Sequence, residues 1–573
     1  MLYENFDMDN NSNDKKILMI SVPTVSLMLP SQQFASILAY MRANGIEVKT
    51  EFPSYEYIHL LGEENYEKLK TDDIGNELFG SLLCDEFGKL QNDEFLSTVY
   101  PTTEKFVKSF AQKIQNYRVD CIVFYVQYSQ LIPALYFAKI INTKSKTKII
   151  FIGFHCGEVL GENLKMVFPF VDETFGKNFE ETLLAYLKDT KIEEKDNLDF
   201  LPTPDYSDAY NKILELKNKG LKVNEDSIGF LVEFSRGCGW NKCSFCTLNC
   251  HTDSFRTRSK INIKNDYRYI REKYKTNVII PEHFEMAENW REQIAGLSDF
   301  TKATSKNLVL NFKVKDLQNE KDFELLKNAD AAILVGTESF SNDYLLKLNK
   351  GQSVIENIQV LKYAERWGVP CFHNVMFGLP FENERHLKES KKNFEYIYHL
   401  QPPFDVEKFR LTFGSAIFNH QEKYGIKRVF KQNRLSKCLS SEIQDKYIPF
   451  FYDFESENGI EDSDNKWLEA VKAWRAKYYF FHNISEPQRE KMLVKSYYEN
   501  VYQIVDYRKG YEVYSLNNTE KKIYDFIDKI CYRHEIYENF SEMSPSFIDE
   551  IIQTFVNKKI AFIEDERVLG LAL

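Results

Sequence analysis

Apolar and polar positions along the chain repeat with two different periods, and the change between them predicts a series of strand and helix units. Residues 15–23 form an apolar run that ends at Pro23, and residues 31–48 continue with helical spacing that closes at Gly45 before a second strand. Further strands are predicted over 119–126 and 147–154, and further helices over 130–142 and 162–168. Strands that alternate with helices indicate a parallel α/β sheet. Residues 15–190 are therefore predicted to form one doubly wound, Rossmann-like domain.

The same alternation restarts at residue 228 and continues through about six strand–helix units. A complete eight-unit barrel is usually larger, so a partial barrel is predicted. The chain after it is predicted to be mostly helical and then to end in helices followed by a β-ribbon, a winged-helix-like pattern. The predicted organisation is a disordered tail over 1–14, the Rossmann-like domain over 15–190, a linker over 191–225, the partial (β/α)6 barrel over 226–415, a helical segment over 416–505 and a winged-helix-like module over 506–573.

Composition restricts the classes of function. The net charge of −11 disfavours a general nucleic-acid binder, which normally carries a basic surface. The chain has no run of about 18 apolar residues, and its acidic, Asn-rich start resembles no signal peptide. We therefore expect a cytoplasmic protein that does not act at a membrane. Its cysteines should be mostly reduced there, so a dense cluster of them indicates metal binding or catalysis rather than disulfides.

Such a cluster occurs in "CGWNKCSFCTLNC", which begins at Cys238. Cys238, Cys243 and Cys246 place three thiolates on one loop directly after the first barrel strand, and thiolates are ligands of iron–sulfur clusters and of zinc. Three cysteines on a four-iron cluster leave one iron open for a substrate. Two alternatives remain at this point: a zinc site completed by Cys250 or His251, and a cluster register that uses Cys250 in place of Cys238.

The motifs around this loop resemble a known family. A three-cysteine loop with an aromatic residue before its last cysteine, at the mouth of a partial barrel, is similar to the radical S-adenosylmethionine (SAM) enzymes. The stretches "EFSRGC", "CSFCTLN", "GTESFSNDYLLKLNKGQSVIENIQVLKYAERWGVP", "NVMFGLPFE" and "HLQPP" resemble the cobalamin-domain radical SAM proteins that mature ribosomally made peptides. "SVPTVSLMLPSQQFASILAYMRANGIEV" and "GFHCGEVLGENLKMVFPFVD" resemble that family's cobalamin-binding half.

The resemblance implies roles for matched positions. Cys238, Cys243 and Cys246 would hold a 4Fe–4S cluster, and SAM would bind its open iron. SAM contacts are implied for Phe245, Glu338, Lys315, Asn374 and Arg410, with Lys315 and Arg410 as strand-borne cations for the SAM carboxylate. Cobalamin contacts are implied for segments that follow the strands of the Rossmann half, at Ser21, Pro23, Leu29, Tyr128, Gln130, Gly153, Cys156 and Gly157. No Asp-x-His-x-x-Gly sequence occurs in that half, so no histidine is expected below the cobalt.

The implied activity is C-methylation of a precursor peptide at an unactivated carbon, through a 5′-deoxyadenosyl radical and methylcobalamin. The cofactors would carry the hard chemistry and the protein would position the reactants, with an external flavodoxin or ferredoxin as electron donor. Alternatives with the same cofactors are epimerisation, crosslinking or rearrangement of the peptide. An alternative from another class is a zinc-containing protein that binds a peptide or nucleic acid. A radical methylthiotransferase acting on tRNA is disfavoured by the charge and by the missing basic C-terminal domain.

Overall fold

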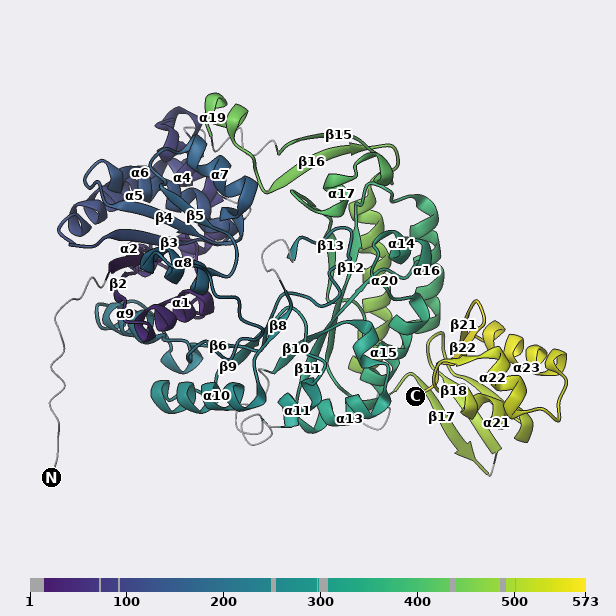
Figure 1. The fold of residues 1–573 in the computed structure, drawn as a ribbon. Coiled ribbons are helices and arrows are strands. Elements are labelled where there is room, and N and C mark those ends of the chain that lie inside the picture. The colour runs from purple at the N-terminus through teal and green to yellow at the C-terminus, as the bar shows by residue number, and fades with distance from the viewer. Residues whose placement is uncertain are drawn as a thin grey trace, which may run out of the picture. The chain divides into compact units, whose positions relative to one another are not determined.

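The computed structural model describes residues 15–71, 74–90, 93–248, 254–295, 297, 308–432, 439–484, 491–499 and 501–573 (Figure 1). The tail predicted over 1–14 lies outside these residues. The chain divides into two compact units, the first made of 1–233, 249–282 and 431–450, the second of 234–248, 283–430 and 451–573. Within the described residues, no helix combines the length and the apolar composition that crossing a membrane requires.

The first unit is built on a five-stranded parallel sheet in the order β2-β1-β3-β4-β5. Its strands are β1 (Lys16–Ile20), β2 (Glu47–Glu51), β3 (Cys121–Tyr125), β4 (Lys148–Ile152) and β5 (Glu173–Phe175). Every residue of the central strand β3 is buried, as expected for a parallel strand covered by helices on both faces. This sheet confirms the predicted doubly wound domain, and its strand order reverses between β1 and β3.

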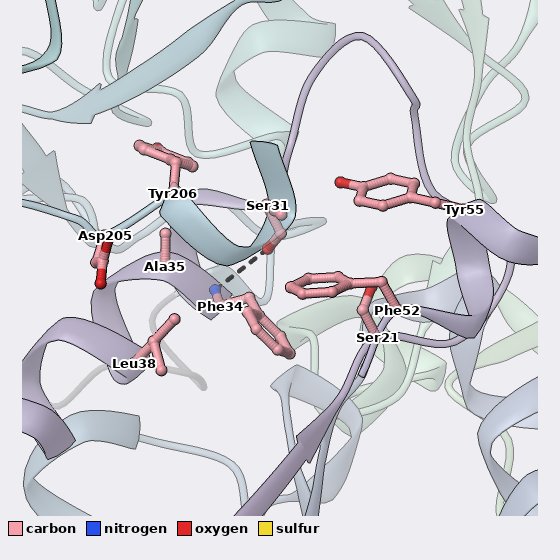
Figure 2. A pocket seen from close by; sticks show the side chains of 10 residues that line it. Ser21, Ser31, Phe34, Ala35, Leu38, Phe52, Tyr55, Asp205 and Tyr206 are labelled. Atoms are coloured by element: carbon pink, nitrogen blue, oxygen red, sulfur yellow. Dashed lines mark hydrogen bonds between the residues drawn. The ribbon is translucent and has the colours of Figure 1, made fainter. Parts of the chain in front are cut away.

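Helices cover this sheet, and the structure contains more of them than the hydrophobic pattern predicted. They are α1 (Gln32–Ala43), α2 (Pro53–Leu61), α3 (Glu63–Lys70), α4 (Ile74–Cys84), α5 (Glu94–Ile114), α6 (Leu131–Asn142), α7 (Glu158–Val167), α8 (Phe179–Lys188) and α9 (Ser207–Asn218). Helices α2 to α5 all lie between β2 and β3, a connection for which the sequence analysis assigned no elements. Helix α1 begins at Ser31, whose Oγ accepts a hydrogen bond from the Phe34 N–H at 3.3 Å, as expected for an N-cap (Figure 2).

Six parallel strands with the predicted alternation follow. In the first unit, β6 (Phe230–Glu233) pairs in parallel with β9 (Ile279–Glu282), and α10 (Lys260–Tyr274) lies between them in the chain. In the second unit, β10 (Val309–Phe312), β11 (Ala332–Glu338), β12 (Cys371–Phe377) and β13 (Asp405–Lys408) form a four-stranded parallel sheet in chain order. The helices of this unit that follow its strands are α11 (Trp290–Ala295), α13 (Glu320–Asn328), α14 (Asn342–Lys347), α15 (Val354–Trp367) and α16 (Glu384–Ile397).

Residues 416–505, which the pattern predicted to be mostly helical, contain strands as well as helices, with more helical than strand residues. Their strands are β15 (Ile426–Lys431), β16 (Phe451–Ser456), β17 (Leu493–Tyr498) and β18 (Val501–Asp506), and β14 (Leu411–Thr412) pairs with β16. Their helices are α17 (Ala416–Asn419), α19 (Ser441–Lys446) and α20 (Ser463–Ile484). Strand β16 is mostly half-buried, and in "FYDFES" apolar and polar residues alternate from Tyr452 to Glu455, which suits a strand. The many aromatic residues nearby hide this short alternation in the sequence.

The C-terminal module combines two small antiparallel sheets with three helices (Figure 1). Strands β17, β18 and β19 (Glu512–Leu516) form one sheet, so the predicted boundary at 505 and 506 falls inside it. The helices are α21 (Asn518–Phe526), α22 (Arg533–Asn539) and α23 (Pro545–Asn557), and the hairpin of β21 (Ala561–Glu564) and β22 (Arg567–Gly570) follows, with β20 (Cys531–Tyr532) beside it. Helices followed by a ribbon agree with the winged-helix-like prediction.

Candidate functional site

Three cysteines lie in one short loop after strand β6. Cys238, Cys243 and Cys246 are free thiols, and Cys243 is within electrostatic reach of both others. The main chain holds the loop, because the N–H of Ser244 donates to the carbonyl of Leu348 at 2.9 Å. The middle of the cysteine loop is therefore fixed to the segment that follows α14.

This donor set fits an iron–sulfur cluster with an open iron. Cys250 and His251, which a zinc site or the alternative cluster register would use, lie outside the described residues. Among the residues that are described, no group of three or more His, Cys, Asp and Glu side chains is arranged to hold a single metal ion. Burial raises the pKa of the Cys243 thiol to about 12 and also raises the pKa of Cys238. Binding of iron must therefore displace protons from these thiols.

Glu338 ends strand β11 in a conformation that is unusual for a side-chain-bearing residue. Its φ is 56°, and the register between β11 and β12 shifts between Val335 and Glu338. Its Oε1 accepts a hydrogen bond from Lys350 Nζ at 2.8 Å. Its Oε2 is buried and has no hydrogen-bond partner among the described residues. A buried carboxylate oxygen without a donor is costly, so this atom is suited to an N–H or O–H group of a ligand.

Lys350 joins Glu338 to the cysteine loop, and the sequence analysis did not identify it. Its Nζ lies 5.7 Å from the centroid of the Phe245 ring. Burial by itself would lower the pKa of Lys350, but the charges of Glu338 and of the nearby Cys243 outweigh it and the pKa is raised. Lys350 therefore stays charged beside Glu338. The sequence signal that could have pointed to Lys350 is a lysine followed by a glycine at the end of "LLKLNKG", just after helix α14.

Glycine residues allow this close packing. A Cβ atom on Gly336 would lie 2.6 Å from Lys350 Nζ and 2.7 Å from Glu338 Oε1. Gly351, at a φ of 74°, lies against the Trp240 ring, where a Cβ would come within 2.3 Å of a ring atom. The Trp240 Nε1–H also donates to the Asn349 carbonyl at 2.9 Å. The cysteine loop and the segment that carries Lys350 are thus packed directly on each other.

Glu285 is a second residue that the sequence analysis missed. It follows strand β9 in "PEHFE" and is buried, and its Oε2 accepts a hydrogen bond from the Gly239 N–H at 3.0 Å. Lys313 Nζ forms an ion pair with its other oxygen, and the Glu285 carboxylate contributes to the raised pKa of Cys238, after burial. Glu285 therefore organises the first part of the cysteine loop.

The other predicted SAM contacts lie farther from this centre. Lys315 is exposed in the turn after β10, with Nζ 6.0 Å from the Trp240 ring centroid, and Arg410 is exposed between β13 and β14, over the Phe451 ring. The prediction that both are strand-borne was wrong, because β10 ends three residues before Lys315 and β13 ends two residues before Arg410. Asn374 lies on β12 and donates a hydrogen bond to Glu407. Burial, followed by the charge of Glu338, raises the pKa of Glu407, so the Asn374–Glu407 pair lies near Glu338.

The residues predicted to contact cobalamin follow strands β1, β3 and β4 at the carboxyl edge of the five-stranded sheet. Gln130 is buried and its Nε2–H donates to the Val22 carbonyl at 2.9 Å, which ties the segments after β1 and β3 together. Pro23 is buried, Leu29 is half-buried, and the side chain of Tyr128 is outside the described set. Ser21 lines a cavity of about 10 Å³ (Figure 2), enough for one water molecule but not for a cofactor.

The loop after β4 is closely packed. The Gly153 N–H donates to the Phe175 carbonyl at 3.0 Å, and Cys156 is completely buried. Gly157 crosses the backbone of Gly176, where a Cβ on Gly157 would lie 3.0 Å from the Gly176 Cα. At this contact two glycine-containing segments pass each other with no side chain between them. The contact lies at the edge of the sheet where doubly wound folds bind their ligands.

Two carboxylates face each other at the ends of β6 and β9, a pair that was not identified from the sequence. Glu233 and Glu282 are register partners in the parallel pair, and the Gln32 Nε2–H donates to Glu233 Oε2 at 3.3 Å. Burial, followed by the charge of Glu233, raises the pKa of Glu282 to about 7. The like charge at the neighbouring position thus adds to burial in disfavouring the ionised form of Glu282.

Replacing Glu282 with glutamine is expected to stabilise the protein in a pH-dependent way. The raised pKa means that the folded state holds a proton that the unfolded chain releases, so wild-type stability falls as the pH rises from about 4.5 to about 7. Glutamine removes this loss and should increase the free energy of unfolding by about 2 kcal/mol at pH 8, with a much smaller gain at pH 5. Urea unfolding at both pH values measures it, with Glu272→Gln on the exposed side of α10 as control. An equal gain at both pH values would contradict the assignment.

Comparisons with known proteins match the part of the chain that carries the cysteine loop. The radical SAM superfamily model matches residues 232–393. The chain is 23% identical over 294 residues to hopanoid C-3 methylase of Methylococcus capsulatus, a match that covers 48% of this chain and 56% of that protein. The chain thus spans little more than half of the length of this relative.

Two solved structures share the fold. The cobalamin-dependent SAM radical enzyme OxsB, with aqua-cobalamin and SAM bound, is 13% identical with a TM-score of 0.54, over 83% of this chain and 70% of that one. The radical SAM methyltransferase TsrM from Kitasatospora setae, with cobalamin and a [4Fe-4S] cluster bound, is 10% identical with a TM-score of 0.50, over 83% of this chain and 92% of that one. Residues 232–393 of this chain are therefore a radical SAM domain, and the chain has the fold of the cobalamin-dependent radical SAM enzymes.

Proposed function

We propose that this protein is a cobalamin-dependent radical SAM methyltransferase whose substrate is a ribosomally made precursor peptide. The radical SAM part of the proposal rests on three thiols in one loop beside the buried Glu338–Lys350 pair. One carboxylate oxygen of this pair has no hydrogen-bond donor among the described residues. The cobalamin part is supported by the fold shared with OxsB and TsrM. The peptide part is supported by stretches such as "NVMFGLPFE" and "HLQPP", which resemble the radical SAM proteins that mature ribosomally made peptides.

Each group at the site has a distinct task. When bound, the cluster supplies an electron to SAM and cobalamin carries the methyl group that is transferred. Cys238, Cys243 and Cys246 hold the cluster, and Glu338 Oε2 accepts a hydrogen bond from SAM. Lys350 orients Glu338, since its Nζ donates a charge-assisted hydrogen bond to Oε1 at 2.8 Å. Phe245 packs against the buried apolar cluster that contains Tyr344 and Leu348, and its ring adds apolar surface beside the cysteines, which helps to exclude water from the reacting atoms.

The experiment that tests the proposal uses the full chain, reconstituted with iron and sulfide without oxygen and reduced chemically or by flavodoxin. It is incubated with SAM, methylcobalamin and a candidate precursor peptide. We expect 5′-deoxyadenosine to form and the peptide to gain the mass of one methylene group, as measured by mass spectrometry.

Other outcomes separate the alternatives. Formation of 5′-deoxyadenosine with a peptide that loses two hydrogens would indicate crosslinking, and an unchanged peptide mass with altered retention would indicate epimerisation or rearrangement. A protein that binds zinc but no iron, and that produces no 5′-deoxyadenosine, would overturn the proposal.

A further inference from the structure

A hairpin at the C-terminal end of the chain contacts the beginning of helix α15. Glu564, the last residue of β21, is buried, and its Oε1 accepts hydrogen bonds from the Asn342 side-chain amide at 2.5 Å and from the Ile355 N–H at 3.1 Å. Ile355 lies in the first turn of α15, where N–H groups have no partner within the helix. A carboxylate from more than two hundred residues away therefore caps this helix, a position that favours negative charge.

The neighbouring strand of the hairpin strengthens the same contact. Arg567 forms an ion pair with Glu564, and its Nη2–H donates to Ser353 Oγ at 3.1 Å. Ser353 is the N-cap of α15. Asn342, whose amide N–H donates to Glu564, also uses its Oδ1 to accept a hydrogen bond from the Val354 N–H at 2.9 Å. Glu564 and Arg567 thus hold the residues on both sides of the helix start.

The start of α15, which Glu564 and Arg567 hold, is also connected to the Glu338–Lys350 pair. Lys350 lies three residues before Ser353, and between them the Gln352 Nε2–H donates to the Gly336 carbonyl at 2.8 Å. In the first turn of α15, the Asn357 Nδ2–H donates to the Thr337 carbonyl at 3.1 Å and to the Ser339 carbonyl at 2.9 Å. The start of α15 therefore grips the strand end on both sides of Glu338, where the backbone is strained.

We propose that Glu564 is a positioning residue for SAM binding, which acts through the start of α15 on Lys350 and on the backbone around Glu338. The inference rests on the proposed function, because it takes Glu338 and Lys350 as the SAM-binding pair. It assigns to the C-terminal module a role in the chemistry of the barrel, in addition to any role in binding a substrate.

A second contact anchors the C-terminal module independently of Glu564. Asp528 accepts hydrogen bonds from Lys362 at 3.0 Å, from Arg366 at 2.7 Å and from Lys495 at 2.6 Å. Lys362 is completely buried and also donates to the Gly570 carbonyl at 2.7 Å. Loss of Glu564 should therefore leave the module attached, which allows positioning to be separated from folding.

The test compares Glu564→Ala with two controls in the reconstituted full chain. Glu566→Ala removes an exposed carboxylate from the turn of the same hairpin, and Lys495→Met weakens the independent anchor. Iron content and the urea midpoint report on folding. SAM affinity by equilibrium dialysis, together with the change that SAM causes in the electron paramagnetic resonance spectrum of the reduced cluster, reports on the site.

We expect Glu564→Ala to keep its iron and to bind SAM about tenfold more weakly, as for loss of one charged hydrogen bond, with a smaller spectral change. Glu566→Ala should match the wild type, and Lys495→Met should lower the urea midpoint without changing SAM affinity.

Wild-type affinity and spectrum in Glu564→Ala would overturn the inference. If that variant fails to fold, Glu564→Leu, which has a similar length but cannot accept a hydrogen bond, is compared instead, and wild-type SAM affinity in it would overturn the inference equally. Failure of the wild type itself to bind SAM would instead contradict the proposed function.

Discussion

Replacing any one of Cys238, Cys243 and Cys246 with alanine is expected to abolish the iron–sulfur cluster and with it all cleavage of SAM. With three protein ligands for the cluster, loss of one leaves two irons without a thiolate, and the remaining pair of ligands does not hold the cluster. We expect iron to fall from about four atoms per chain to less than one, and 5′-deoxyadenosine to fall below detection. Iron analysis after anaerobic reconstitution measures the first quantity and chromatography the second.

The matched control for this experiment is Cys250→Ala, in the same stretch of sequence. It should keep full iron content and activity if Cys238 is the first ligand. The reverse result, with iron lost in Cys250→Ala and kept in Cys238→Ala, would indicate the alternative cluster register. Retention of iron in all three single variants of Cys238, Cys243 and Cys246 would contradict the site altogether.

Replacing Lys350 with methionine is expected to produce the largest effect among variants that leave the cysteines intact. The side chain is 15% exposed and its Nζ lies 2.8 Å from Glu338 Oε1, so its loss leaves a buried carboxylate without a cation. Breaking a buried pair in this way costs about 3–5 kcal/mol. We expect a loss of this size in the free energy of unfolding, measured in urea, together with strongly weakened SAM binding.

The control is Lys347→Met on the neighbouring helix. Lys347 pairs with Asp343 at 3.0 Å, with both side chains more than a third exposed, and such pairs contribute less than about 1 kcal/mol. The double variant Lys350→Met with Glu338→Gln should recover most of the stability, because no charge is left unpaired, but not the SAM affinity. Recovery of both would mean that the pair is only structural. A Lys350→Met protein as stable as Lys347→Met would contradict the burial of the pair.

The stability prediction for Glu282 and the positioning role of Glu564 share a feature with Lys350. None of these residues was given a role from the sequence, although Lys350 lies in one of the stretches that resemble the family. Each acquires its role from a partner that only the folded chain brings near. Glu282 meets Glu233 only because β6 and β9 pair in parallel. Glu564 meets Ile355 only because the C-terminal hairpin contacts α15.

The cations illustrate why the site was predicted only in part. The sequence offers Lys315, Arg410 and Lys350 as cations, and the first two were assigned to SAM because they were expected to lie on strands. Burial decides between them, since Lys350 is almost enclosed beside Glu338 whereas Lys315 and Arg410 are exposed. A charged side chain is buried only where a partner compensates for the loss of water, and that partner is supplied by tertiary structure.

The helical prediction for residues 416–505 failed for a related reason. Aromatic residues are frequent throughout this chain, so that strands such as β16 are hard to distinguish from helices by apolar content alone. Strand β16 pairs with β14, which lies just before residue 416, and with β15, which lies about twenty residues earlier in the chain, so its place in a sheet depends on residues outside its own stretch.

The amino-acid sequence by itself determined the alternation of strands and helices, the place of the cysteine loop after a barrel strand, and Glu338 at a strand end. These features depend on periods and spacings within about twenty residues, over which the backbone geometry of helices and strands dictates which side chains share a face. Only the tertiary structure decided that Lys350 pairs with Glu338, that Glu285 holds the cysteine loop, and that Glu564 caps α15. The Glu285 and Glu564 contacts join segments that are 46 and 209 residues apart, and the Lys350–Glu338 pair, 12 residues apart, depends on burial that apolar spacing does not reveal. The free energy that selects these contacts comes from burying charges and polar groups together.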